Sequence, residues 1–132
     1  MSKLQLDYLT PESLQRYIDL IHSKNDNEVY LPIPGELFSD DRFKRISNGG
    51  KLLISLMLDK TAASIGNGWI DEQDRLYIIY PNNEIMSDLR IKKGKAAGLI
   101  KELQEIGLIK INQQGTGKPN IIYVMNIFDQ NS

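Results

Sequence analysis

Residues 81–125 read PNNEIMSDLRIKKGKAAGLIKELQEIGLIKINQQGTGKPNIIYVM, and the order of elements within this stretch decides the fold. Apolar residues at helical spacing predict a helix that starts after Pro81 and continues through Leu89. A connection of only two residues leads into a second helix over residues 92–106, which Gly107 is expected to end as its C-cap. The stretch therefore predicts two helices joined by a tight turn.

A β-hairpin is predicted directly after this helix pair. Residues 108–111 and 120–125 are short apolar runs rich in β-branched side chains, as strands are. The link between them, QQGTGKP over residues 113–119, is polar and contains two glycines, which is typical of a hairpin tip. The C-terminal part of the chain thus has the order helix, turn, helix, hairpin.

Upstream residues predict two shorter helical segments. Thr10-Pro11-Glu12 is a helix start, with a hydroxyl N-cap followed by proline at the first helical position. This helix is expected to end near Lys24. Ser39-Asp40-Asp41 predicts the cap of a short helix that carries Phe43 and Ile46.

A longer helix is expected to start at Ser47, its N-cap, and to end at the Gly66-Asn67-Gly68 segment. The side chains expected on its buried face are Leu52, Leu53, Leu56 and Met57, with Lys60 as a further candidate. Trp69-Ile70 and residues 76–80 are then expected to pair as two strands around a polar turn.

The complete order is that of a winged helix-turn-helix, an α+β fold, with an N-terminal helical extension. In that fold the helix before the final hairpin is the recognition helix, and the hairpin is the wing. The expected units are a helical extension over residues 1–29, a winged-helix domain over residues 30–128 and a frayed tail over residues 129–132.

Composition excludes several classes of function. The 132 residues contain no cysteine and a single histidine, His22, which excludes disulfide scaffolds, thiol nucleophiles, zinc fingers and multi-histidine metal sites. No nucleophile–base pair is visible, so we expect no enzyme, no metal and no cofactor. The apolar runs are too short to span a membrane and the N-terminus lacks a signal-peptide core, so a cytoplasmic protein is expected.

Charge is distributed unevenly along the chain. Residues 90–120 contain seven Lys and Arg against two Glu, a net charge of +5, whereas the rest of the chain carries −6. A single basic segment on an otherwise acidic molecule indicates a local anionic partner, as in nucleic-acid binding.

The recognition helix carries the first group of candidate DNA-binding residues. The expected apolar stripe of this helix consists of Ala96, Leu99, Ile100, Leu103 and Ile106. It leaves Gly94 and Gly98 on the opposite side, where the missing side chains let the backbone approach DNA closely. Lysines cluster at its N-terminal end, which enters the major groove in helix-turn-helix docking and favours phosphate. The alternative is a basic helix end that is only solvated. The candidates in this segment are Arg90, Lys92, Lys93, Lys95 and Lys101.

The wing carries the second group. Its side chains donate and accept hydrogen bonds from a flexible tip, which suits phosphate contact or reading of the minor groove. An ordinary polar hairpin turn is the alternative. The candidates are Gln113, Gln114, Thr116, Lys118 and Asn120.

Other polar and aromatic side chains are assigned structural roles. Surface ion pairs with Asp40 and Asp41 are expected for the cations that follow them, namely Arg42, Lys44 and Arg45. The acidic turn that begins at Asp71 is expected to be solvated. The aromatic residues expected in the sheet and core are Trp69, Tyr77 and Tyr123.

Several segments, found in this order, resemble the RepA_N family, the N-terminal domains of replication initiators of plasmids from Gram-positive bacteria. The resemblance covers about residues 30–124 and is carried by Leu31-Pro32-Ile33-Pro34, by Asn67-Gly68-Trp69-Ile70-Asp71 and by Gln114-Gly115-Thr116-Gly117-Lys118-Pro119-Asn120. The chain departs from the family pattern at Gly49-Gly50 and at Lys92-Lys93-Gly94-Lys95.

The resemblance implies binding of double-stranded DNA at repeated sites of a plasmid replication origin, usually as a homodimer. It also implies a longer protein, in which a second domain absent from this chain engages host replication proteins. Two other functions share the pattern: a winged-helix transcription regulator, and a winged-helix interaction or dimerisation module without DNA contact. The basic segment argues against the latter.

The helix that follows Thr10 is the element expected to mediate dimerisation. Its apolar face either packs against its own domain or meets a second copy, and the sequence leaves both arrangements open. A dimer would place two recognition helices on one side of a duplex.

Overall fold

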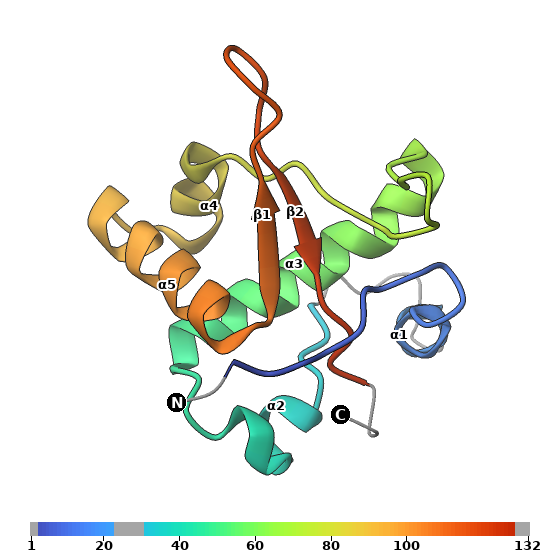
Figure 1. Ribbon diagram of the computed structural model, residues 1–132. Helices are drawn as coiled ribbons and strands as arrows, with labels where there is room; N and C mark the ends of the chain where they lie inside the picture. The colour runs from blue at the N-terminus through green and yellow to red at the C-terminus, as the bar shows by residue number, and fades with distance from the viewer. Residues whose placement is uncertain (1–2, 23–30, 129–132) are drawn as a thin grey trace.

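The computed structural model describes residues 3–22 and 31–128 (Figure 1). The helices are α1 (Gln15–His22), α2 (Glu36–Ser39), α3 (Asn48–Asn67), α4 (Asn82–Leu89) and α5 (Lys93–Ile106), with a 3-10 turn, η1, at Asp41–Phe43. The strands are β1 (Ile109–Asn112) and β2 (Ile121–Val124). This order confirms the predicted α+β winged helix, with α5 as the recognition helix and the β1–β2 hairpin as the wing.

The long helix α3 begins and ends where its sequence predicts. The Ser47 hydroxyl accepts a hydrogen bond from the Gly50 amide at 3.0 Å, which satisfies one of the free donors of the first turn. At the other end Gly68 adopts the left-handed conformation, with φ of +72°, and its amide bonds back to the last turn.

The buried face of α3 is rotated relative to the prediction. Leu53 and Met57 are fully buried as expected, but Leu52 is 42% exposed, so its assignment to the buried face is wrong. The core-facing stripe continues instead through Leu58 and Thr61, at spacings of three and four residues. Leu52 lies one step of about 100° beyond the edge of that stripe.

The wing is an antiparallel pair in which Ile109 lies opposite Val124 and Asn112 lies opposite Ile121. The expected strand over residues 76–80 is reduced to isolated bridges, from Leu76 to Ile70 and from Ile78 to Ile122. The backbone explains the difference, because successive amides of this segment bond to different neighbours. Leu76 donates to the Leu9 carbonyl, Tyr77 to that of Trp69 and Ile78 to that of Ile122, so no single ladder continues.

The N-terminal segment packs against the winged helix. The Leu4 amide donates to the Ile106 carbonyl at 2.9 Å, and Tyr8 forms a bridge with Met125. Leu14, just before α1, and Tyr17 of α1 belong to the common core. Of the two arrangements left open by the sequence, the structure therefore shows packing of this apolar face on its own chain. The unit boundary at residue 29 stays a prediction, as does dimerisation.

A four-residue helix, α2, was not expected. It buries Leu37 and leaves the Phe38 side chain 65% exposed. One helical turn is too short to show a hydrophobic period, which explains why the sequence gives no sign of it. The next turn agrees with expectation, because the Asp40 side chain caps η1 by accepting from the Arg42 amide and Phe43 is buried.

The start of α1 differs by a few residues from the expected position. Residues 11–14 form turns, in which the Ser13 amide donates to the Thr10 hydroxyl at 3.1 Å, before α1 begins at Gln15. The expected helix end near Lys24 and the frayed tail at residues 129–132 lie outside the described residues. Within the described part of the chain, no helix is both long and apolar enough to cross a membrane.

Candidate nucleic-acid interface

The helix-turn-helix is built around one left-handed residue. Arg90 ends α4 with φ of +55°, a backbone conformation that is uncommon for residues other than glycine, asparagine and aspartate. The next amide, that of Ile91, donates to the Met86 carbonyl at 3.0 Å, so the chain reverses within two residues. The Arg90 side chain is exposed in this turn, just before α5 begins.

A hydrogen bond fixes α4 to the segment before it. The Tyr80 hydroxyl donates to Asp88 Oδ2 at 2.5 Å, and burial together with this bond raises the pKa of Tyr80. The Lys60 ammonium lies 4.6 Å from the centre of the same ring. Because α4 also packs against α5, these contacts help to set the orientation of the recognition helix.

The recognition helix separates an apolar face from a basic end. Four side chains of the predicted stripe are buried, those of Ala96, Leu99, Ile100 and Leu103, whereas Ile106 at its end is only half-buried. Lys92 occupies the N-cap position, and the first turn contains no acidic residue. The lysines exposed at this end are Lys92, Lys93 and Lys95. They surround the amides that have no partner within the helix, an arrangement that attracts phosphate.

The outer face of α5 carries two exposed glycines, Gly94 and Gly98. A Cβ atom added at Gly94 or at Gly98 would meet no heavy atom within 4 Å, so neither glycine is required by packing inside the chain. The exposed Lys101 lies further along the helix, and its ammonium is 3.8 Å from Glu105 Oε1. The helix thus presents bare backbone between its terminal lysines and Lys101.

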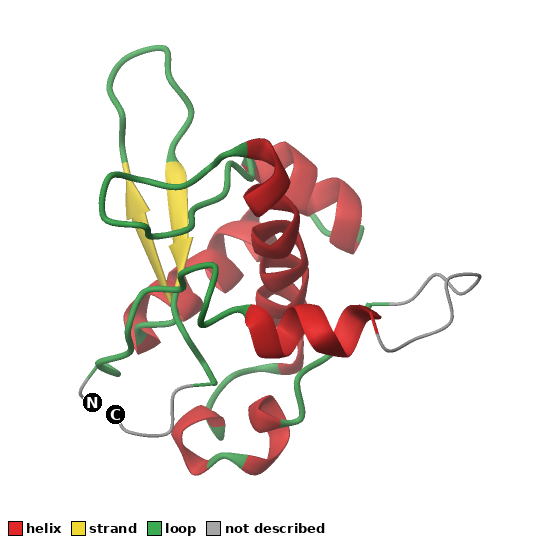
Figure 2. Ribbon diagram, turned by 90° about the vertical axis from the view of Figure 1, so that its right-hand side faces the viewer, coloured by secondary structure: helices red, strands yellow, loops and turns green. Residues whose placement is uncertain are grey.

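The wing tip projects beyond the body of the molecule in both views (Figure 1 and Figure 2). Residues 112–120 are all exposed. Gly115 and Gly117 adopt φ values of +114° and +80°, which L side chains rarely adopt, so the tip depends on them. All five wing candidates lie in this exposed segment: Gln113, Gln114, Thr116, Lys118 and Asn120.

The structure brings nine of the ten candidates together as two groups on separate elements. One group surrounds the N-terminal end of α5 and the other lies along the wing. Near the wing base, a cleft of about 240 Å³ is lined by Pro81 and Asn82 at the start of α4, by Ile100 of α5 and by Asn120. Lys101 lies apart from both groups, two turns along α5 from Lys93.

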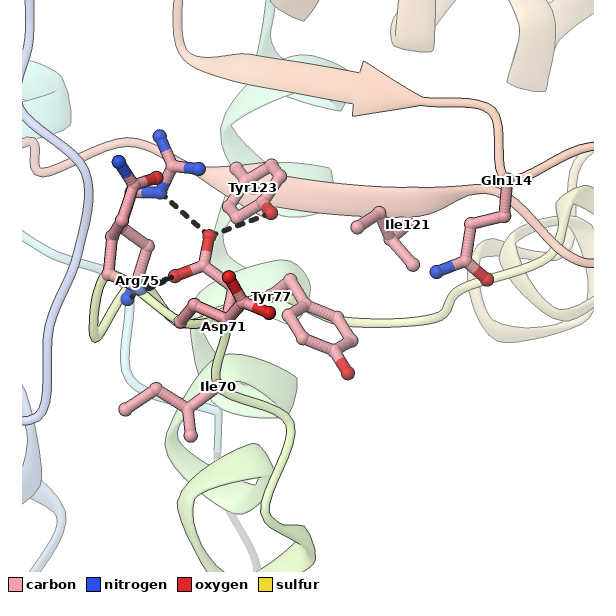
Figure 3. Close-up of a pocket in the computed structure, with 9 residues that line it drawn as sticks. Ile70, Asp71, Arg75, Tyr77, Gln114, Ile121 and Tyr123 are labelled. Carbon is pink, nitrogen blue, oxygen red and sulfur yellow. Dashed lines mark hydrogen bonds and ion pairs between the residues drawn. The ribbon is translucent and has the colours of Figure 1, made fainter.

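Asp71 forms a network at the base of the wing that the sequence did not reveal (Figure 3). Its Oδ2 accepts from Arg75 Nε at 2.7 Å and from the Tyr123 hydroxyl at 2.9 Å, and its Oδ1 accepts from the amides of Gln73 and Arg75. Burial acts to raise the pKa of Asp71, but these hydrogen bonds outweigh it and lower the pKa to about 2. The expectation of a merely solvated turn is wrong for Asp71, since the carboxylate fastens the turn to β2.

Stacked rings extend this network. The Arg75 guanidinium lies 4.4 Å from the ring centre of Tyr8 and 5.2 Å from that of Tyr123. Trp69 and Tyr77 stack nearly parallel, with ring centres 6.4 Å apart. Tyr123 is buried, in line with its expected role, whereas Trp69 and Tyr77 are only half-buried. Asp71 and Arg75 flank a turn instead of lying on one helix face, so no spacing rule in the sequence pointed to this cluster.

The expected surface ion pairs are present for only one of three cations. Arg42 pairs with Asp40 at 2.8 Å. Lys44 and Arg45 form no ion pair with any residue that the structure describes, so the expectation is wrong for both. The described residues also contain no group of three or more side chains suited to holding a metal ion.

Comparison with known proteins gives matches over most of the chain. The model of a protein family described as the N-terminus of replication initiator protein A (RepA) matches residues 29–132. A 41 kDa protein of Lactobacillus helveticus is 24% identical over 93 residues, which are 70% of this chain and 26% of the relative. This chain thus spans about a quarter of the length of that relative.

Solved structures have the same fold. One described as the N-terminal domain of a DNA binding protein has 30% identity and a TM-score of 0.67, covering 92% of this chain and 84% of its own. One described as a Rep–DNA complex has 30% identity and a TM-score of 0.67, covering 90% and 83%. One described as an MDR initiator, at 23% identity and a TM-score of 0.64, covers 92% and 93% and shows the fold alone.

Proposed function

Because the chain belongs to the RepA_N family of replication initiator N-termini, we propose that it is the double-stranded DNA-binding module of a replication initiator. One observation carries the proposal: exposed lysines surround the N-terminal end of a recognition helix whose outer face is open. The proposal also draws support from the similarity to the Rep–DNA complex, whose protein is 30% identical over 90% of this chain.

The N-terminal end of α5 enters the major groove. Lys92, Lys93 and Lys95 then lie close to phosphates and to guanine edges, both of which lysine binds. The free amides of the first turn add a positive helix end directed at phosphate. Gly94 and Gly98 remove the side chains that would hold the helix backbone away from the bases.

The wing binds beside the recognition helix. Lys118 contacts phosphate, and the amide side chains of Gln113 and Gln114 bind base edges in the minor groove, where readout distinguishes mainly A·T from G·C. The wing tip is exposed along its whole length, so these side chains are free to meet a duplex without unpacking the core.

In the whole initiator, we propose, this module binds repeated sites of a plasmid replication origin as a homodimer in the cytoplasm. A part of the initiator outside the residues described above contacts host replication proteins. The module itself performs no catalysis, since its proposed role is to position the initiator on the origin.

Selection from a pool of random duplexes tests this proposal. The protein is expected to enrich one sequence family that matches repeats in the origin of the replicon encoding it. Enrichment of sites upstream of genes instead would favour a transcription regulator. No enrichment, together with no retention of duplex DNA at low salt, would contradict DNA binding and favour a protein-interaction module.

A further inference from the structure

A solvent-open groove of about 770 Å³ lies beside the C-terminal half of α5, away from the terminal lysines. Cations from three separate parts of the chain line it, namely Lys3, Arg45 and Lys101, and all three residues are exposed. We propose that this flanking groove binds the phosphate backbone of double-stranded DNA next to the segment that α5 enters. The inference rests on the proposed function and extends its interface to Lys3 and Arg45.

Lys3 is held against the end of α5 by close backbone packing. The neighbouring Leu4 amide donates to the Ile106 carbonyl at 2.9 Å. A Cβ atom at Gly107 would lie 2.7 Å from both Lys3 Cγ and the Leu4 carbonyl oxygen, so only glycine fits this contact. Gly107 therefore ends α5 and also gives room to the stem of Lys3, which lines the groove.

Arg45 is placed by the connection between η1 and α3. Two residues later, Ser47 is hydrogen-bonded to Glu102 of α5, which ties this connection to the recognition helix. Arg45 forms no ion pair with any of the residues described. Its guanidinium offers a fork of donors, which suits phosphate oxygens.

Two carboxylates share the groove, but each already has a partner. Glu102 accepts from Ser47 through both of its oxygens, and Glu105 lies 3.8 Å from the Lys101 ammonium. The groove therefore has one more positive charge than negative, and Lys3 and Arg45 are its two cations without an ion pair among the described residues. This excess favours a polyanion over a neutral or cationic partner.

The length of α5 places the flanking groove at the edge of a bound duplex. Fourteen residues span about 20 Å, at roughly 1.5 Å per residue, whereas the major groove is about 12 Å wide. In the proposed arrangement α5 crosses the groove, so its C-terminal half lies at the adjacent sugar–phosphate backbone. Phosphates at that point meet the side chains of Arg45 and Lys3.

The salt dependence of binding tests this proposal. Affinity is measured by fluorescence anisotropy over a series of salt concentrations, on an origin-repeat duplex and on a scrambled duplex of about 30 base pairs, roughly three helical turns. Arg45→Ala and Lys3→Ala are each expected to reduce the slope of log affinity against log salt by about 0.9 on both duplexes. Arg45→Lys, which keeps the charge, is expected to retain the slope.

Lys110→Ala is the matched control. Lys110 is an exposed cation of β1, and its ammonium lies 4.8 Å from the Tyr8 ring centre. Thermal unfolding of each variant shows that the fold is kept. If the native protein binds and Lys93→Ala weakens binding, but Arg45→Ala and Lys3→Ala keep the full slope, the flanking groove is excluded and the proposed function stands. If the native protein binds neither duplex, both fail.

Discussion

Glu102 in the recognition helix accepts two hydrogen bonds from Ser47, the N-cap of α3: one from the backbone amide at 2.6 Å and one from the hydroxyl at 2.7 Å. The same hydroxyl accepts from the Gly50 amide, so the start of α3 and the middle of α5 share one hydrogen-bonded unit. This unit joins the long helix that carries the core to the helix proposed to read DNA. It makes the orientation of α5 depend on residues 55 positions apart in the sequence.

Glu102→Ala should therefore destabilise the fold more than its half-buried position suggests. Loss of a charged acceptor for two donors at a helix N-cap is expected to lower the free energy of unfolding by about 1 to 2 kcal/mol. Urea denaturation measures this change. The control is Glu105→Ala, which removes only a solvent-exposed i, i+4 pair and is expected to cost less than about 0.5 kcal/mol. Equal losses in the two variants would contradict the role of the Ser47 contact.

Two helical glycines should respond to alanine in opposite ways. At Gly50 a Cβ atom would lie 2.8 Å from Ile46 Cγ2 and 3.1 Å from Glu102 Oε2, so Gly50→Ala is expected to lower stability by about 1 kcal/mol despite alanine's helix preference. At Gly98 the space is open, and Gly98→Ala is expected to raise stability by about 0.5 to 1 kcal/mol. Thermal unfolding measures both changes.

A large side chain at Gly98 should also weaken DNA binding. If the α5 backbone approaches DNA closely there, Gly98→Leu should weaken binding of an origin-repeat duplex at least tenfold while the fold stays intact. Anisotropy titration of the folded variant measures this. Unchanged affinity in Gly98→Leu would show that the outer face of α5 does not meet DNA at this position.

Protonation of the Asp71 carboxylate in acid should lower the free energy of unfolding. Its pKa is lowered to about 2 in the folded protein from an ordinary value of 3.8, so the folded state favours the charged carboxylate. The contribution is fully present above about pH 4 and is lost as the pH falls through about 2. After allowance for solvent screening it amounts to about 1 to 2 kcal/mol.

Asp71→Asn should remove this acid-sensitive component. Urea denaturation between pH 2 and pH 5, about the range in which this carboxylate titrates, measures the difference between variant and native protein. Asp74→Asn serves as the control, because Asp74 lies exposed in the same turn and asparagine also adopts its left-handed conformation at φ of +61°. An identical pH dependence in Asp71→Asn and the native protein would contradict the assigned network.

The wing tip should matter for binding but not for stability. Replacing residues 113–120 with a two-residue Asn-Gly turn removes only exposed residues and preserves the pairing of Asn112 with Ile121. Thermal unfolding is expected to change little, while affinity for an origin-repeat duplex falls at least tenfold. If the shortened protein binds as tightly as the native one, the wing has no part in the interface.

Local signals in the sequence predicted the elements that position the interface. Three helix boundaries depend on residues within one helical turn and are confirmed: Ser47 as the N-cap of α3, the Gly66-Asn67-Gly68 segment as its end, and Gly107 as the C-cap of α5. The apolar stripe of α5 was predicted for the same reason. The ten candidate DNA-binding residues stay predictions, although the structure places nine of them at the N-terminal end of α5 or along the wing.

The features that the sequence did not reveal are those that depend on long-range contacts. The Ser47–Glu102 bonds and the Tyr123–Asp71 bond join residues more than 50 positions apart, and no spacing rule connects them. Leu52 was assigned to the wrong face because several apolar residues in a row leave the direction of the core undecided. Lys44 and Arg45 lie near acidic residues in the sequence, but only the folded chain shows that they do not pair with them.

The most direct test of the proposed function is fluorescence anisotropy on an origin-repeat duplex and a scrambled duplex, at several salt concentrations. The native protein is compared with Lys93→Ala and Lys95→Ala, and with Lys110→Ala as the control. Tighter binding to the repeat, with a steep salt dependence that both α5 variants reduce and the control keeps, is the predicted result. Absence of salt-dependent binding to either duplex, or an equal effect of all three substitutions, would contradict a DNA interface at the N-terminal end of α5.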